Sequence, residues 1–189
     1  PNAINAANGG TGTIGINENN MIVEKVYGIK SSLTSANTSP SLLANAYATN
    51  GTTTKGIISL TNGISVYGLY TDAQNSYAFN AYGKGANGEI KINGYGSGVS
   101  AIEGSAYNAF GENAIGKITI NSSASIRFVS KGVSGKQAYN AYGKNAQGTI
   151  EISGNTTELY YGISATDYAY NAYGEGALGT IKINGTGIG

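Results

Sequence analysis

The sequence of 189 residues contains no cysteine, no histidine and no tryptophan, and it has only two prolines. Without cysteine the chain forms no disulfide and offers no thiolate to a metal. Without histidine it lacks the commonest general base and the commonest transition-metal ligand. The scarcity of proline argues against a disordered linker, although 30 residues are glycine. The absence of cysteine also suits a chain that crosses a membrane unfolded, because a premature disulfide would block its passage.

Charge is scarce as well, since charged residues make up 11% of the chain, against about 25% in typical proteins. The formal net charge is +1 and lysines alternate with glutamates, so the chain has no basic stripe that would attract nucleic acid. No apolar run approaches the roughly 18 residues that a membrane-spanning helix needs. We therefore expect no nucleic-acid partner, no direct membrane insertion by this segment, no cofactor and no metal.

The feature that the chain does contain is a repeated tetrapeptide, Asn-Ala-Tyr-Gly. Its complete, altered or worn copies begin at Asn5, Asn45, Asn80, Asn108, Asn140 and Asn171. Successive asparagines are 40, 35, 28, 32 and 31 positions apart. A fixed period of this size indicates a repeat architecture, in which each repeat is one structural unit that stacks on the next.

Two further segments recur in a fixed order after the tetrapeptide. The first is Gly-x-Ile-x-Ile, as in Gly88–Ile92 and Gly116–Ile120, with polar residues between the isoleucines. This alternation is typical of a short, half-buried strand. The second resembles Val-Tyr-Gly-Ile and also favours a strand. Its clear copies start at Val26, Val66 and Tyr160, and its looser copies are Val99–Ile102 and Ser130–Val133.

Three short strands per repeat predict an all-β fold, a right-handed parallel β-helix with about six coils of roughly 30 residues. We interpret residues 1–189 as a single solenoid segment cut from a longer array. Equivalent residues would form ladders, above all a structural ladder of Asn45, Asn80, Asn108, Asn140 and Asn171. An asparagine there tolerates a left-handed backbone and can bind its neighbours in the adjacent coils. Of the aromatic residues, we expect Tyr82, Phe110, Tyr142 and Tyr173 to form the more buried column.

These units resemble the passenger repeats of autotransporter proteins, the Gly/Asn/Thr-rich kind on the surface of Gram-negative bacteria such as Campylobacter-like species. The resemblance covers essentially the whole chain and rests on its structural motifs. It implies export through the outer membrane and an extracellular location at the bacterial cell surface. It also implies roles in adhesion, autoaggregation or surface layering, with a host-cell or bacterial surface protein or glycan as partner and with possible self-association.

The acidic residues require scrutiny because several β-helix proteins are polysaccharide lyases or glycosidases. Glu112 and Glu175 occupy equivalent repeat positions, where Lys84 and Lys144 alternate with them. A glycosidase needs two carboxylates about 5–10 Å apart in a groove, and a lysine lies between these two. Alternating charges on neighbouring coils attract weakly and favour the correct register. We therefore predict no catalytic residue and no enzymatic activity.

Three hypotheses remain for function. The first is a non-catalytic surface passenger that acts as adhesin, autoaggregation factor or structural stalk. Its candidate contact residues lie in the variable connections, because insertions in solenoids map to one face: Ser31, Ser32, Thr34, Asn37, Tyr70, Asp72 and Asn75. The second is a carbohydrate-active β-helix enzyme, and the third is a self-assembling extracellular filament subunit. The tyrosines suit ladder packing better than a sugar-binding platform because they keep the repeat register.

Overall fold

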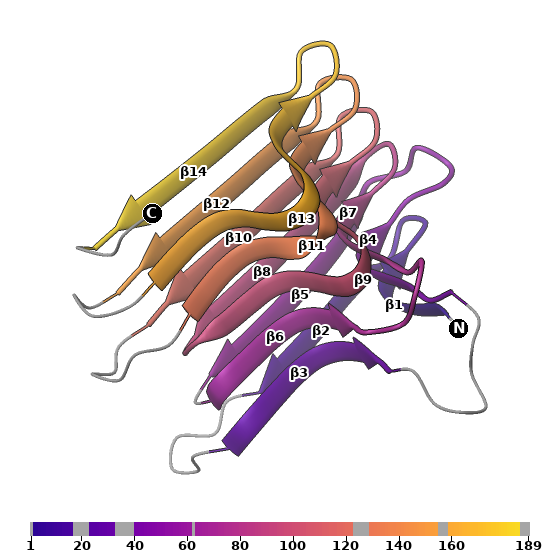
Figure 1. The fold of residues 1–189 in the computed structure, drawn as a ribbon. Coiled ribbons are helices and arrows are strands. Elements are labelled where there is room, and N and C mark those ends of the chain that lie inside the picture. The colour runs from indigo at the N-terminus through magenta and orange to yellow at the C-terminus, as the bar shows by residue number, and fades with distance from the viewer. Residues whose placement is uncertain are drawn as a thin grey trace.

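The structure, a computed structural model, describes residues 2–16, 23–32, 40–61, 63–122, 129–154 and 159–185. Within these ranges the chain forms two β-sheets and no α-helix, and neighbouring strands are parallel. The strands stack coil upon coil, from indigo at the N-terminus to yellow at the C-terminus (Figure 1). The chain is therefore a parallel β-solenoid, as the sequence predicted.

One sheet is built from the Gly-x-Ile-x-Ile segments. Its six strands are β2 (Thr11–Ile16), β5 (Thr54–Thr61), β8 (Ala86–Asn93), β10 (Ile115–Asn121), β12 (Gln147–Ser153) and β14 (Leu178–Asn184). They pair in chain order and in register, so that Ile118 lies between Ile90 and Ile150 of the adjacent coils. Residues at equivalent positions of successive repeats are thus neighbours in adjacent, hydrogen-bonded strands.

The other sheet has eight strands and holds the two remaining segments of each coil. Its strands are β1 (Asn2–Ala7), β3 (Val23–Ser31), β4 (Leu42–Tyr47), β6 (Gly63–Thr71), β7 (Tyr77–Tyr82), β9 (Gly96–Phe110), β11 (Val129–Tyr142) and β13 (Leu159–Tyr173). Strands β1, β4 and β7 carry the tetrapeptide segment, and β3 and β6 carry the Tyr-Gly segment. Both segments pair with different parts of β9.

The prediction of three short strands per coil holds only for the first coils. From β9 onward the Tyr-Gly segment and the next tetrapeptide join in one strand of 14 or 15 residues. The connection there is too short to leave the sheet, and a register shift between Gly135 and Gln137 absorbs the difference in length between neighbouring coils. The sixth coil has no Tyr-Gly segment among the described residues, so complete turns are slightly fewer than the six predicted.

The main core lies between the two sheets. Ile118 and Ile120 are fully buried, as are their counterparts in β8 and β12, and they pack with Val99 and Val133 of the facing sheet. A Cβ on Gly98 would lie 2.5 Å from Cγ2 of Ile118. The glycine of the Tyr-Gly segment is therefore needed because the isoleucine of the opposite sheet fills the space that a side chain would take.

A second, smaller core lies under the turns that follow each tetrapeptide. It consists of alanines that are almost completely buried: Ala46, Ala48, Ala81, Ala86, Ala109, Ala114, Ala141 and Ala146. Small side chains suit this place because the chain reverses within a few residues, which brings the two sheets close together. The turns themselves need a left-handed backbone, with a φ of 114° at Gly111 and 54° at Asn113.

Candidate functional site

The motif asparagines form a hydrogen-bonded column between the two cores. Each Nδ2 donates to Oδ1 of the asparagine in the next coil, at distances of 2.8 to 2.9 Å from Asn5 through to Asn171. These contacts run through the residues that the sequence proposed as a ladder: Asn45, Asn80, Asn108, Asn140 and Asn171. The first four are fully buried, and Asn171 is exposed on the last described coil.

The amide column also ties the turn to both sheets. Nδ2 of Asn108 donates to the carbonyl of Gly116 at 2.9 Å and to that of Thr149 at 3.1 Å. A Cβ on Gly116 would lie 2.1 Å from the backbone oxygen of Asn108, so only glycine fits opposite the asparagine. Because the protein's own groups occupy these amides, the column is a structural feature and not a ligand site.

The left-handed role predicted for the motif asparagine is wrong. Asn113 and Asn145, which lie in the following turns, have a φ of 54° each. The ladder asparagines lie inside strands, where they keep an extended backbone. The two properties of asparagine, its tolerance of positive φ and its amide hydrogen bonds, are thus used at different positions of the repeat.

The aromatic residues form two stacked columns on the outside of the sheet. Phe79, Tyr107 and Tyr139 stack with ring centroids 4.9 and 4.7 Å apart. Phe110 and Tyr142 stack at 5.1 Å in the second column. Rings of the two columns meet edge to face, as Tyr107 and Phe110 do at 4.9 Å. Burial raises the pKa of Tyr107 to about 12.

The prediction that Tyr82, Phe110, Tyr142 and Tyr173 form the more buried column is therefore wrong. Phe79, Tyr107 and Tyr139 are the buried rings, and the predicted column is partly exposed or, at Tyr173, exposed. The reason is that the asparagine and the alanines around it occupy the interior. Both aromatic positions of the motif are then left on the outer face, where they pack against one another.

Five glutamates lie in surface ion pairs, among them the two candidate catalytic residues. Lys84 Nζ is 3.3 Å from Glu112 Oε1, and Lys144 Nζ is 3.7 Å from Glu175 Oε2. Both glutamates project from exposed turns, two coils apart along the stack. A glycosidase needs two carboxylates that face each other across a substrate groove. Lysine and glutamate instead alternate from coil to coil at this position, and their attraction favours the correct register of the stack.

The predicted contact residues that the structure describes lie in adjacent coils, since β3 pairs with β6 so that Ser31 is beside Thr71. Ser31 ends β3, and its hydroxyl lies 2.8 Å from that of Ser41. The hydroxyl of Ser32 is buried and has no hydrogen-bond partner among the residues that the structure describes. Asp72 and Asn75 lie in the bend after β6, and Asn75 is exposed. Thr34 and Asn37 lie outside the described residues.

Tyr70 lies on the outer face of β6. Its ring contacts Tyr67 edge to face at 5.0 Å and Tyr27 at 5.3 Å. Its pKa is raised, first by burial and then by the negative charge of Asp72. Tyr70 is thus part of an aromatic cluster that the structure shows on β3 and β6, in which Tyr27 and Tyr67 stack at 5.3 Å.

A row of serines interrupts the aromatic surface at the next coil. Strand pairing places Ser97 beside Tyr67, Ser100 beside Tyr70, and Ser105 beside Tyr77. Three successive outward tyrosines are therefore followed by three serines. We call Ser97, Ser100 and Ser105 the serine row. Small residues at these positions lower the surface along β9, and two hollows lie over that strand.

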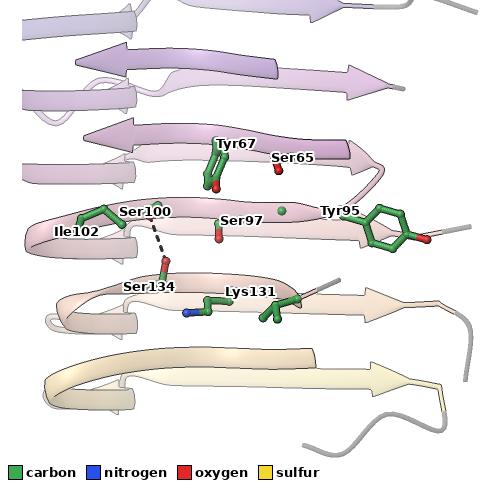
Figure 2. A pocket seen from close by; sticks show the side chains of 10 residues that line it. Ser65, Tyr67, Tyr95, Ser97, Ser100, Ile102, Lys131 and Ser134 are labelled. Atoms are coloured by element: carbon green, nitrogen blue, oxygen red, sulfur yellow. Dashed lines mark hydrogen bonds between the residues drawn. The ribbon is translucent and has the colours of Figure 1, made fainter. Parts of the chain in front are cut away.

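The first hollow has a volume of about 280 Å³ and lies over Ser97. Figure 2 shows Tyr67, Ser97 and Lys131 one above another on three successive strands. Ser65 and Ser100 add hydroxyl groups, and Ser134 donates a hydrogen bond to Ser100 at 3.2 Å. No carboxylate of the described residues lines this hollow. Its polar character therefore comes from hydroxyls and one ammonium group.

The second hollow has a volume of about 340 Å³ and lies at the other end of the serine row. Tyr77 and Tyr107 line it, together with Glu103 and Lys136, whose charged groups are 2.8 Å apart. The hydroxyl of Ser105 donates to Oε1 of Gln137 at 3.2 Å. This hollow differs from the first in that its lysine is already paired with a carboxylate of the protein.

The serine row is not apparent in the sequence because Val99–Ile102 resembles Val66–Leu69 and hides the true repeat. The structure instead pairs Val66 with Gly96 and Leu69 with Val99. The true copy is therefore Gly96–Val99. The signal that marks it is the glycine that faces the isoleucine of the other sheet, which is Gly98 here and Gly68 in the preceding coil.

Comparison with protein-family models, curated proteins and solved structures found no match to this chain. Among the described residues, no helix has the length and apolar character needed to cross a membrane. Nor do those residues contain a group of three or more acidic, histidine or cysteine side chains arranged to hold a metal ion. The features of this chain that bear on function are therefore the chemical groups on the surface of the solenoid.

Proposed function

We propose that the chain is a non-catalytic, extracellular β-solenoid that acts as an adhesin or structural stalk at a bacterial cell surface. The observation that supports this most is the difference between the residues of the interior and those of the outer face. Isoleucine, alanine and asparagine fill the interior in every coil, and the outer face of the larger sheet carries tyrosines, serines and few charges. Such a face offers contact area, whereas an active site needs reactive groups held in a groove.

The repetitive interior suits a stalk. Each coil contacts mainly its two neighbours, and in-register pairing continues through all six strands of the smaller sheet. Stability in such an array is close to a sum of coil and interface terms. A solenoid of this kind can be lengthened without redesign, which fits a protein that holds a contact surface away from a cell.

The carbohydrate-active enzyme remains the rival hypothesis. Glu112 and Glu175 are the candidate pair, but each forms an exposed ion pair, with Lys84 and Lys144 respectively. The acids on the smaller sheet are paired as well: Glu151 lies 3.6 Å from Lys117 and 3.5 Å from Lys182. This pattern favours a structural role for the acids.

The experiment uses the purified chain and bacteria that display it. Cells displaying the chain should adhere to epithelial cells or aggregate with one another more than cells displaying an unrelated solenoid. The purified chain should release no new reducing or unsaturated ends from pectate, alginate or hyaluronate. Turnover that disappears in both Glu112→Gln and Glu175→Gln would establish the enzyme instead, and displayed chains that change neither adhesion nor aggregation would contradict the proposal.

A further inference from the structure

We propose that the hollow over Ser97 binds one carboxylate-bearing sugar unit, such as a sialic acid or a uronic acid, of a surface glycan. The proposal rests on the function proposed above only for the source of the glycan. The site consists of Tyr67, Ser97 and Lys131, together with the hydroxyls of Ser65 and Ser100. We call this site the ring slot.

The first argument is the interrupted ring stack. Tyr27 and Tyr67 stack with their planes 13° apart. The next residue in the same column is Ser97, and the one after it is Lys131. Tyr67 therefore has a ring on one side and a serine on the other. A ligand ring that lies over Ser97 would continue the stack and cover the second face of Tyr67.

The second argument is size. Tyr67 and Lys131 are two strand spacings apart, or about 9.6 Å. The protein's own stacked rings are separated by 4.7 to 5.5 Å from coil to coil. One ring therefore fits between Tyr67 and Lys131, and two stacked rings do not. This favours a single sugar unit at the end or branch of a glycan over a polymer chain laid along the stack.

The third argument is polarity. A pyranose ring has one apolar face, which suits the face of Tyr67, and a rim of hydroxyl groups. Ser65 and Ser97 provide hydroxyls that both donate and accept hydrogen bonds. An aromatic peptide side chain would leave these groups without partners, because its ring offers no matching donors or acceptors. A binding site typically combines an apolar wall with a few polar groups in this way.

The fourth argument is charge. Lys131 is half-buried and is the one charged residue among the described residues that line the hollow. Its Nζ lies 5.9 Å from the ring centroid of Tyr161, which holds the side chain along the outer face. A lysine that lines a slot in which no described carboxylate lies favours a ligand that brings a carboxylate. A sugar with a carboxylate can cover the ring of Tyr67, bond to the serine hydroxyls and pair with the charge of Lys131.

Direct binding to the purified chain tests the ring slot. The probes are 3′-sialyllactose and digalacturonic acid, with lactose as the neutral control and N-acetyl-tyrosinamide as the aromatic control, measured by saturation-transfer NMR and titration. At least one acidic sugar should bind about tenfold more tightly than lactose, as expected for one charge-assisted hydrogen bond. The probe that binds identifies the source of the carboxylate. Equal binding of lactose, stronger binding of the tyrosine amide, or no binding of either acid would overturn the proposal.

Ser97→Tyr is the decisive variant, because it fills the slot with the residue that stacks there in the two preceding coils. It should weaken binding at least tenfold while the thermal midpoint stays unchanged or rises. Lys131→Met should remove the preference for the acidic sugar, and Lys131→Arg should keep it. Lys91→Met, on the other sheet, is the matched control. Wild-type binding by Ser97→Tyr, or equal effects of Lys131→Met and Lys91→Met, would contradict the assignment.

The two proposals fail separately. If the purified chain binds neither acid while displayed cells still adhere, the ring slot is wrong and the adhesive function stands. If the chain binds an acidic sugar but displayed cells do not adhere, the slot is correct and the adhesive function is wrong. Displayed Ser97→Tyr connects them, since it should lower adhesion only if this slot carries it.

Discussion

Replacing Asn108 by leucine should strongly destabilise the solenoid although leucine has nearly the same size. Asn108 is fully buried in the middle of the stack. Its Nδ2 lies 2.8 Å from Asn140 Oδ1 and 2.9 Å from the carbonyl of Gly116, and its Oδ1 accepts from Asn80 at 2.9 Å. Leucine can make none of these contacts.

The magnitude follows from the groups left behind. The amide of Asn80 keeps two carbonyl acceptors, those of Gly88 and Lys117, so its loss is partial. Asn140 Oδ1 and the carbonyl of Gly116 lose a donor inside the protein, and each buried unsatisfied group costs about 1–3 kcal/mol. The apolar surface that leucine buries offsets part of this. We expect Asn108→Leu to lower the free energy of unfolding by about 3 kcal/mol.

Urea unfolding followed by tyrosine fluorescence and circular dichroism measures the effect, because both probes must give the same midpoint before a single free energy is used. The matched control is Asn171→Leu, on the exposed last described coil, where the amide donates only to the carbonyl of Gly179 at 2.9 Å among the described residues. That variant should change stability by less than about 1 kcal/mol. If Asn108→Leu costs no more than Asn171→Leu, the ladder does not stabilise the stack.

Three further predictions concern sterics, burial and surface charge. Gly116→Ala should destabilise the fold by about 3 kcal/mol because its Cβ would meet a carbonyl oxygen at 2.1 Å, whereas Gly15→Ala, with nothing within 4 Å, should be neutral in the same urea assay. The raised pKa of Tyr107 means that its contribution to stability is present below pH 10.0 and is lost as the pH rises to about 12. Tyr107→Phe should therefore lose less stability than wild type over that interval in alkaline thermal melts, and an equal loss would contradict the assignment. Lys84→Met should cost less than about 1 kcal/mol because its ion pair with Glu112 is exposed, and a larger loss would show that the surface charges do more than set register.

The strands of the smaller sheet and the parallel stacking could be predicted from the sequence because the pattern there has one explanation. Ile118 and Ile120 alternate with polar residues and recur at a fixed distance from the motif. Burial of one face is the strongest constraint on a strand's register. The isoleucines therefore specified both the strand type and the pairing between coils.

The outer face could not be predicted in the same way because tyrosine suits both sides of a sheet. Phe79 and Tyr82 are three positions apart, so strict alternation along a strand places one of them inward. The pattern did not show that the asparagine between them would occupy the interior by bonding to its neighbours. The ring slot was missed for a related reason, since Ser97 carries no apolar signal and only the facing isoleucine fixes its register.

The length of β9 was also beyond the sequence pattern. Its two segments are separated by residues such as Glu103 and Gly104, which read as a turn. The structure keeps this backbone in one strand because both neighbouring coils pair with β9 up to Ala101 and again from Ser105 onward. Strand pairing between coils therefore outweighs the local preference of these residues for a turn, as is common in sheets.

The central claim is that the outer tyrosine and serine face is the contact surface of a non-catalytic solenoid. Adhesion of cells that display the chain tests it most directly. The variant with Tyr67, Tyr70 and Tyr77 changed to serine alters that face, and a variant with Lys91 and Thr119 changed to alanine alters the outside of the smaller sheet. At equal display the first should lose adhesion and the second should keep it. Equal adhesion by both variants and the wild type would contradict the claim.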